Sequence, residues 1–293
     1  MISISSLIKE TNLGIYEVQV WLLLYRSLFI STVLFNSQTW SRIRKKDIEL
    51  LQIAQLKFLK RILNLPSSTP NSFLFLELGV LPIESEIHKR QLMYLHRILM
   101  LPEEDPVHQM FTNQVAFAEK GESNWWSQVK QLLVKYNLSQ NLDEIKNLSK
   151  MTFKGMVNKA VTSTAFEDLK NQCASLKKTA DLSYDTFQVQ GYLKELYPNQ
   201  ARVVLKGRCK TLDLKTHNTY MYKGDTICRG CGIEEETLEH ILNCGQDEML
   251  TFDLSKIDTN SECVVTKLIQ ATNRIMLFKE MCEDEEKPKI TTE

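Results

Sequence analysis

The chain lacks an excess of charge of either sign. Its 293 residues carry 36 lysines and arginines against 36 aspartates and glutamates, so the formal net charge is zero. A protein that binds nucleic acid through most of its surface needs a large positive charge, and this composition excludes that class. Any contact with phosphate groups must therefore come from local basic patches.

The sequence also lacks the usual features of a secreted or membrane-spanning chain. Its start, MISISSLIKETNLG, has no basic segment followed by an apolar core, so we expect no signal peptide. The most apolar run, residues 18–35, carries Arg26 at its centre. An arginine at the middle of a bilayer costs about 2.5–3.5 kcal/mol on insertion scales, which favours a buried helix over a transmembrane one. We expect an intracellular chain, cytoplasmic or nuclear, with no membrane partner.

Repeats of fixed period and low-complexity tracts are absent as well. With 43% hydrophobic residues, the chain can bury a sizeable core and has room for two domains. Four of the seven cysteines, at positions 173, 209, 263 and 282, lie far apart in the sequence. This spacing is typical of reduced thiols in a cytosolic or nuclear protein. Disulfide pairing in a secreted chain is the alternative, but the N-terminal sequence does not support secretion.

Helical periodicity dominates the first part of the chain. Residues 43–63 place apolar side chains on one side of a helix and basic side chains on the other. The basic side could follow a phosphate backbone or simply face solvent. The basic residues that we consider candidates for nucleic-acid contacts are Lys46, Lys57, Lys60 and Arg61.

Further helices are predicted over residues 72–78, 83–100, 125–136 and 145–176, with Gly79 ending the first of them. Because Trp125 and Trp126 are adjacent, we expect only one to face the core. The other would be a boundary residue or a platform for stacking a base. The sequence thus predicts a mainly α fold. Its predicted parts are a helical domain (1–105), a helical connecting region (106–192), a zinc module with a basic lead-in (193–250) and an acidic, partly disordered tail (251–293).

Four residues near the C-terminus have the spacing of a metal site. Cys228, Cys231, His240 and Cys244 follow the pattern C-x2-C-x8-H-x3-C, which is typical of a tetrahedral Cys3His zinc site. Glycines flank Cys231 and relieve the tight turn. The segment EEETLEHILNC is predicted to be a helix with acidic residues in its first turn, which places His240 and Cys244 on one face. With four protein ligands, the expected Zn²⁺ is structural. The alternative is buried free cysteines with a surface histidine.

The segment before this motif combines basic and aromatic residues. Basic side chains can contact a nucleic-acid backbone while aromatic rings stack on its bases, a combination found in compact single-strand binders. The polar surface of a small metal-nucleated fold is the other interpretation. The candidates for nucleic-acid contacts here are Arg202, Lys206, Arg208, Lys210, Lys215, Tyr220 and Tyr222.

Three segments, in order along the chain, resemble the C-terminal part of a non-LTR (LINE-type) retrotransposon reverse transcriptase. Residues 24–40 resemble the helix that follows the palm of that family, which an aromatic-Gly-x-Glu-x-Trp motif closes. Phe35, Asn36, Gln38 and Trp40 stand at those places, so the glycine and the glutamate are replaced.

The second segment, ELGVLP from Glu77 to Pro82, resembles the E-L-G-x-L-P signature of the family's thumb-like region. The third is the Cys3His motif, preceded by the basic segment and Asn218. The resemblance implies that residues 1–105 are thumb-like and that the zinc module contacts RNA or DNA, as single strands or as template RNA.

The resemblance also implies that this chain is not an enzyme. The family's polymerase holds two Mg²⁺ ions with carboxylates of an aromatic-x-Asp-Asp motif in its palm, and this sequence has no Asp-Asp pair. Only 49 residues follow Cys244, too few for the restriction-like nuclease of some members. We therefore expect a non-catalytic fragment of a reverse transcriptase.

Two other functions remain open. The zinc could brace a protein-interaction scaffold, although a RING or PHD module needs eight ligands and adding Cys209 and His217 gives only six. The chain could also be a decayed transposon remnant without function, as the replaced motif positions and the missing palm indicate.

Overall fold

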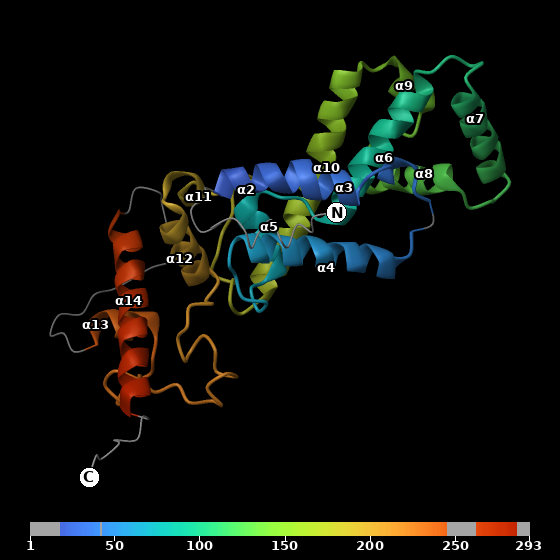
Figure 1. Ribbon diagram of the computed structural model, residues 1–293. Helices are drawn as coiled ribbons and strands as arrows, with labels where there is room; N and C mark the ends of the chain where they lie inside the picture. Colours follow the sequence, from blue (N-terminus) through green and yellow to red (C-terminus); the bar gives the residue numbers. More distant parts are fainter. Residues whose placement is uncertain (1–17, 42, 245–261, 286–293) are drawn as a thin grey trace, which may run out of the picture.

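A computed structural model describes residues 18–41, 43–244 and 262–285, and these residues are mainly helical, as the sequence predicts (Figure 1). Within these ranges there is no extended strand, only two isolated antiparallel bridges, between Leu78 and Val189 and between Ile227 and Glu235. None of the helices in the described part of the chain is long and apolar enough to cross a membrane.

The N-terminal helical run is divided into α2 (Val18–Leu24), a π-helical stretch (Tyr25–Ile30) and α3 (Ser31–Val33), with a short 3₁₀ turn following at Ser37–Thr39. The other helices, in chain order, are α4 (Lys45–Ile62), α5 (Asn71–Leu78), α6 (Ile83–Leu99), α7 (Pro106–Glu119), α8 (Trp125–Lys135), α9 (Leu142–Asn147), α10 (Lys150–Ser175), α11 (Tyr192–Glu195), α12 (Pro198–Arg208), α13 (Leu238–Asn243) and α14 (Glu262–Glu285).

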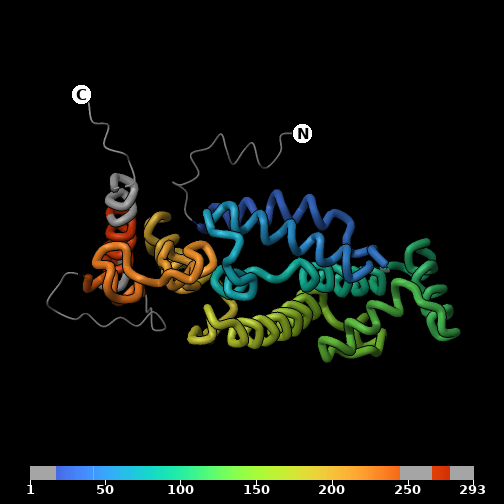
Figure 2. The backbone as a smooth tube through the Cα atoms, turned by 90° about the horizontal axis from the view of Figure 1, so that it is seen from below, coloured from blue at the N-terminus to red at the C-terminus, as the bar shows by residue number. Residues whose placement is uncertain are grey.

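The helices of the N-terminal half form layers. Helices α2 and α4 lie on one side, α5 and α6 form the middle, and α10 runs along the opposite side, as Figure 2 shows. Helices α11 to α14 lie beyond one end of these layers. Residues 212–244, which carry the Cys3His group and are called the metal module below, therefore lie at an end of the helical layers.

The described residues form two apolar cores. The smaller one is built from α6 to α10 and includes Leu92, Val129 and Phe153. The larger one joins the N-terminal helices to residues between Leu169 and Leu242, including Cys228 of the metal motif, and to the buried face of α14. The metal module thus shares a continuous core with the N-terminal helices.

The connecting region differs from its prediction in two ways. The helix predicted over 145–176 is broken at Leu148, and α10 begins after Ser149, whose hydroxyl accepts a hydrogen bond from the Thr152 amide (3.1 Å). Trp125 and Trp126 are both buried, at 7% and 5% exposure, so the expectation that only one would face the core is wrong. Phe111 of α7 packs edge-on against both indole rings, with centroids 6.4 and 5.4 Å apart.

Asn36 stands where the resembling family has glycine, and its backbone is in the left-handed region, with φ = 56°. Glycine adopts this conformation freely, and asparagine tolerates it better than most other residues. The turn is held by neighbouring contacts: Trp125 Nε1 donates to the Gln38 carbonyl (2.9 Å), and Gln91 Nε2 donates to the Trp40 carbonyl (2.8 Å). The backbone at Asn36 therefore has a shape that a glycine would also allow.

Glu77 and Gly79 of the ELGVLP segment connect the N-terminal helices to the chain that leads into α12. Gly79 caps α5 with φ = 55°, as predicted, and a Cβ there would lie 2.6 Å from the backbone of Gln188. The fully buried Glu77 carboxylate accepts hydrogen bonds from the Tyr184 and Tyr192 hydroxyls (2.7 and 2.6 Å).

Arg208 completes this cluster. Its Nε lies 3.0 Å from Glu77 Oε1, and its guanidinium sits over the ring of Tyr192 (5.8 Å to the centroid). The Glu77 carboxylate raises the pKa of the Tyr184 phenol further above its ordinary value, although burial is the larger cause. Because Arg208 is the last residue of α12, the cluster fixes α12 against α5.

The predicted acidic tail contains a helix. Residues 262–285 form α14, which packs against α12 and α13. Leu268, Ala271 and Ile275 are buried in the larger core, so this part of the predicted tail is folded. The remaining parts of the predicted tail, 251–261 and 286–293, lie outside the described residues.

Candidate metal centre

A tight turn carries the first two cysteines. The Cys228 amide donates to the Glu234 carbonyl (2.7 Å), and the Gly232 amide donates back to the Cys228 carbonyl (2.9 Å). Of the two glycines beside Cys231, only Gly232 has a positive φ (68°), so it is the one whose lack of a side chain the turn requires. This turn brings both thiols to one side.

Helix α13 supplies the other two ligands. It begins after Thr237, whose hydroxyl accepts a hydrogen bond from the His240 amide (3.0 Å). Cys244 caps the far end, one turn beyond His240. The predicted helix start is wrong, because the three glutamates at 234–236 precede α13 instead of forming its first turn.

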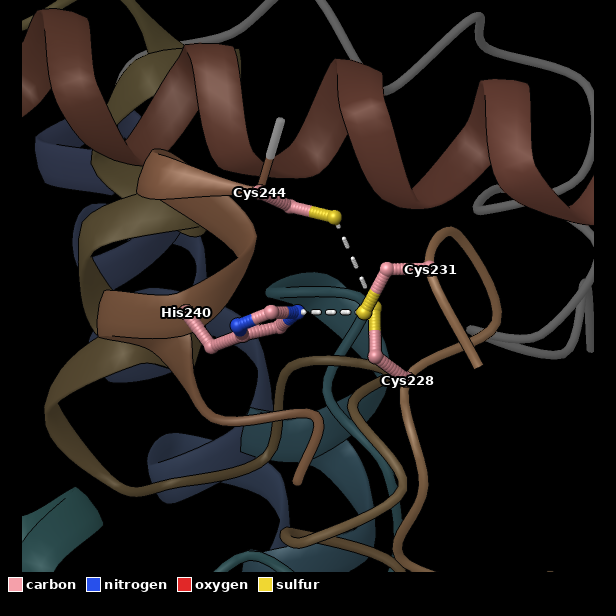
Figure 3. A group of neighbouring side chains, drawn as sticks. All are labelled: Cys228, Cys231, His240 and Cys244. Atoms are coloured by element: carbon pink, nitrogen blue, oxygen red, sulfur yellow. Dashed lines mark hydrogen bonds between the residues drawn. The ribbon is translucent and has the colours of Figure 1, made fainter. Parts of the chain in front are cut away.

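The four side chains point toward one another (Figure 3). Their ligand atoms all lie within 4.8 Å of one another, which makes this group able to hold a metal ion. The sulfurs of Cys228 and Cys244 are 3.9 Å apart, and the Cys231 sulfur is 3.3 Å from His240 Nε2. Ligands at tetrahedral zinc, with bonds of about 2.3 Å to sulfur and 2.0 Å to nitrogen, would be about 3.8 and 3.5 Å apart. The spacing fits a four-coordinate ion.

Glu234 fixes the orientation of the histidine ligand. Its Oε2 lies 2.8 Å from His240 Nδ1. A carboxylate that accepts the Nδ1 proton leaves Nε2 unprotonated and directed at the ion, as is usual for metal-bound histidines. The imidazole is therefore set for metal binding.

The thiols differ in acidity. Backbone hydrogen bonds from Glu234 and Ile233 lower the pKa of Cys231 to about 7. Burial, with the neighbouring Cys228 sulfur as the next cause, raises the pKa of Cys244 to about 12. Three thiolates this close repel one another unless a cation lies between them, so binding of a metal ion would release protons.

A buried ion pair between Arg229 and Glu236 stabilises the turn that carries the first two cysteines. Glu236 is fully buried, and its two oxygens accept hydrogen bonds from Arg229 Nη2 (2.6 Å) and Nε (2.8 Å). The same carboxylate accepts the backbone amides of Arg229 and Lys215 (3.1 and 2.9 Å). The Arg229 guanidinium also lies over the ring of Tyr222, 5.3 Å from its centroid. Removing either charge would leave the other buried without its partner.

Helix α14 anchors the other side of the centre. Arg274 Nη1 donates to the carbonyls of Ile241 and Leu242 (2.8 and 2.9 Å), and it lies 3.4 Å from that of Cys244. These carbonyls have no partner within α13, and a cation at a helix C-terminus also favours the helix dipole. Arg274 on α14 thus helps to position Cys244, a candidate metal ligand.

Arg208 is a correction to the predicted nucleic-acid contacts. Its side chain is buried (6% exposed) and paired with Glu77, so it cannot reach a strand on the surface. Arg208 lies in a segment that combines basic and aromatic residues, which is the pattern that predicted a contact. The carboxylate that explains its burial lies 131 positions earlier.

Several other predicted contacts already have protein partners. Lys210 pairs with Asp181 (2.9 Å), and Lys215 pairs with Asp225 (2.5 Å).

The remaining candidates for nucleic-acid contacts differ in their hydrogen-bonding partners and in their exposure to solvent. The Lys60 ammonium donates to the carbonyls of Ser67 and Thr69 (2.8 and 2.6 Å). Arg202 and Lys206 are half-buried. The Tyr222 hydroxyl donates to Asp213 (2.7 Å). The exposed candidates are Lys46, Lys57, Arg61 and Tyr220. Apart from Arg208, the nucleic-acid contacts stay predictions.

Sequence reasoning missed three residues that organise the centre. Arg229 and Glu236 lie inside the motif, and their opposite charges seven residues apart were a local signal. Arg274 lies 30 residues beyond Cys244, and nothing in the local sequence indicates that it caps α13.

Comparisons with protein-family models, with curated proteins and with solved structures gave no match.

Proposed function

We propose that this chain is a non-catalytic, nucleic-acid-binding fragment of the reverse-transcriptase type, with a structural Zn²⁺ at Cys228, Cys231, His240 and Cys244. The observation that carries the metal part is the convergence of the four ligand atoms within 4.8 Å. Three thiolates and one imidazole form a ligand set that zinc favours, and all four positions are filled by protein. Such an ion would brace the module and carry out no chemistry.

The nucleic-acid part is supported by the surface beside the metal centre. The Tyr220 ring is 96% exposed, and it lines the same cleft as Lys206. A fully exposed aromatic ring next to a cation is suited to stacking a base while the cation contacts the backbone. Lys46 and Lys57 on α4 add further exposed positive charge.

Two parts of the structure support the resemblance to non-LTR reverse transcriptases: the turn at Asn36 and the ELGVLP segment. Asn36 adopts the left-handed backbone that suits the family's glycine at that place. Gly79 and Glu77 of the ELGVLP segment both have a structural reason for their identity: close backbone approach for the glycine and three buried hydrogen bonds for the carboxylate. These features support descent from that family and need no catalytic residues.

Fluorescence anisotropy with a labelled single-stranded RNA tests the proposal. The full chain, loaded with zinc, is titrated at two salt concentrations, and the titration is repeated after the metal is removed with a chelator. We expect affinity that falls steeply with salt, because phosphate contacts release counterions, and that drops when zinc is removed. Binding that depends on neither salt nor zinc would contradict it.

A protein-interaction scaffold is the second candidate, and α7 is the observation that favours it. Met110 and Phe117 on this helix are 63% and 45% exposed, and both line a groove of about 520 Å³. Large exposed apolar side chains beside a groove are common at protein interfaces. If the chain binds no RNA while Met110→Ser abolishes capture of a partner, the scaffold function replaces the first proposal.

A further inference from the structure

A cleft of about 750 Å³ lies between the loop that follows α4 and the loop that follows α12. Residues 64–68 form one wall, and Thr211, Asp213 and residues 217–221 form most of the other. Lys178, just beyond α10, and Lys206 of α12 complete the lining. The cleft therefore joins segments that are more than 100 positions apart in the sequence.

The lining of this cleft is positively charged. Among the described residues, no carboxylate lies within ion-pair distance of Lys178 or Lys206, unlike Lys210 and Lys215 nearby. Of the described residues that line the cleft, Asp213 is the only acidic one, and its carboxylate accepts a hydrogen bond from the Tyr222 hydroxyl (2.7 Å). Two half-buried ammonium groups facing one cavity without counterions favour an anionic ligand.

His217 lies in the same lining and has an unused polar atom. Its Nδ1 is buried and has no hydrogen-bonding partner among the described residues. Burial, together with the positive charges of Lys178 and Lys210, lowers the pKa of the His217 imidazole to about 4. A buried polar atom without a partner costs free energy that a ligand can recover.

The walls of the cleft are fixed by hydrogen bonds. The Lys60 ammonium holds the Ser67 and Thr69 carbonyls on one side. On the other side, Asn218 Nδ2 donates to the Leu212 carbonyl (2.8 Å). Because these contacts already hold the cleft walls in place, ligand binding would cost little conformational entropy of the protein.

Tyr220 decides the class of ligand. It lines the cleft, and its ring is 96% exposed. A free phosphate or a lipid headgroup has no planar group that can stack on this ring, whereas a nucleic-acid strand has a base that can.

We propose that this cleft binds the sugar–phosphate backbone of a single strand. In this arrangement Lys178 and Lys206 contact phosphates, and Tyr220 stacks on a base at the entrance. The inference rests on the proposed function and adds Lys178 to two predicted contacts, Lys206 and Tyr220, which the fold brings to the same cleft.

The salt dependence of binding tests the cleft. The double variant Lys178→Ala/Lys206→Ala is compared with wild type and with Lys154→Ala/Lys159→Ala, which removes two exposed lysines from α10. Each lost phosphate contact lowers the slope of log K against log salt by about 0.7, so the cleft variant should lose about 1.4. If the variant and wild type bind equally at 1 M salt, a slope that is lower by about 1.4 makes the variant bind roughly 25-fold more weakly at 0.1 M salt. The control variant should bind like wild type.

Tyr220→Leu and nuclear magnetic resonance of His217 give independent readouts. Loss of stacking should weaken binding of a 12-nucleotide RNA by about tenfold without changing the salt slope. A bound phosphate near the imidazole should raise the pKa of His217, and the signal is assigned with His217→Gln. Inorganic phosphate at the same concentration should move that pKa far less, because it cannot stack on Tyr220.

The outcomes separate this inference from the proposed function. If wild type binds RNA but both double variants lose affinity equally, the cleft is not the site, and the proposed function stands. The same conclusion holds if His217 does not respond to the strand. If wild type binds no RNA at any salt concentration, the proposed function and the cleft both fail. Circular dichroism of each variant checks that a lost affinity is not lost folding.

Discussion

The helical layers and the metal module are stabilised by different interactions. In the layers, fully buried apolar residues such as Leu92, Leu95 and Val129 interlock between α6, α8 and α10. In the module, residues 212–244 contain one short helix, and a buried ion pair and four convergent ligands fix the rest. Apolar contacts weaken little by little when side chains are trimmed, whereas an ion pair or a metal site fails when one member is lost.

The largest expected effect comes from removing a metal ligand. Cys231→Ser should leave α6 intact and release the turn at 226–236, because metal binding supplies most of the stability of small modules, on the order of 10–16 kcal/mol for zinc. Hydrogen exchange resolved along the chain is the measurement. Amides such as those of Cys228 and Glu236 should lose protection, while amides of α6 keep it. Unchanged exchange at the turn would mean that the four residues do not bind a metal.

The next effect tests the contact between the helical layers and α12, the helix that leads into the metal module. Glu77→Ala leaves Arg208 buried without its partner, and breaking a buried pair in this way costs about 3–5 kcal/mol. Urea unfolding measures the loss. The control is the double variant Glu77→Leu/Arg208→Met, which removes both charges and should cost less than the single change. A double variant that is less stable than Glu77→Ala would show that the pair itself, and not the orphaned charge, dominates.

The smallest effect concerns the fit of the histidine. Glu234→Gln weakens the hydrogen bond to His240 Nδ1 without removing a ligand, and such changes typically reduce metal affinity by about 10–100-fold. Competition with a chromophoric chelator measures it. Glu235→Gln, at an exposed neighbour that does not contact the ligands, is the matched control. Equal losses of metal affinity in both variants would show that Glu234 does not support the histidine ligand.

The sequence predicted the parts of the structure that depend on local pattern. The period of apolar residues located α4, α6 and α8 to within about two residues, and the cysteine and histidine spacing located the ligands. Gly79 was recognised as a helix cap from its position alone. These features depend on neighbours in the sequence, which a single sequence displays.

The sequence could not predict the contacts between distant segments. Arg208 resembled a surface residue until the fold placed Glu77 beside it. The acidic run at 234–236 resembled a first helical turn, although Glu234 holds His240 and Glu236 holds Arg229. The acidic residues around α14 made this segment resemble a disordered tail. Its apolar face is buried only because the fold places α12 and α13 beside it.

X-ray absorption at the zinc edge on the purified chain tests the central claim most directly. The account predicts one zinc per chain, with three sulfur ligands at about 2.3 Å and one nitrogen at about 2.0–2.1 Å, and loss of this signal in His240→Ala. A chain that carries no zinc, or zinc bound only by oxygen, would contradict the account.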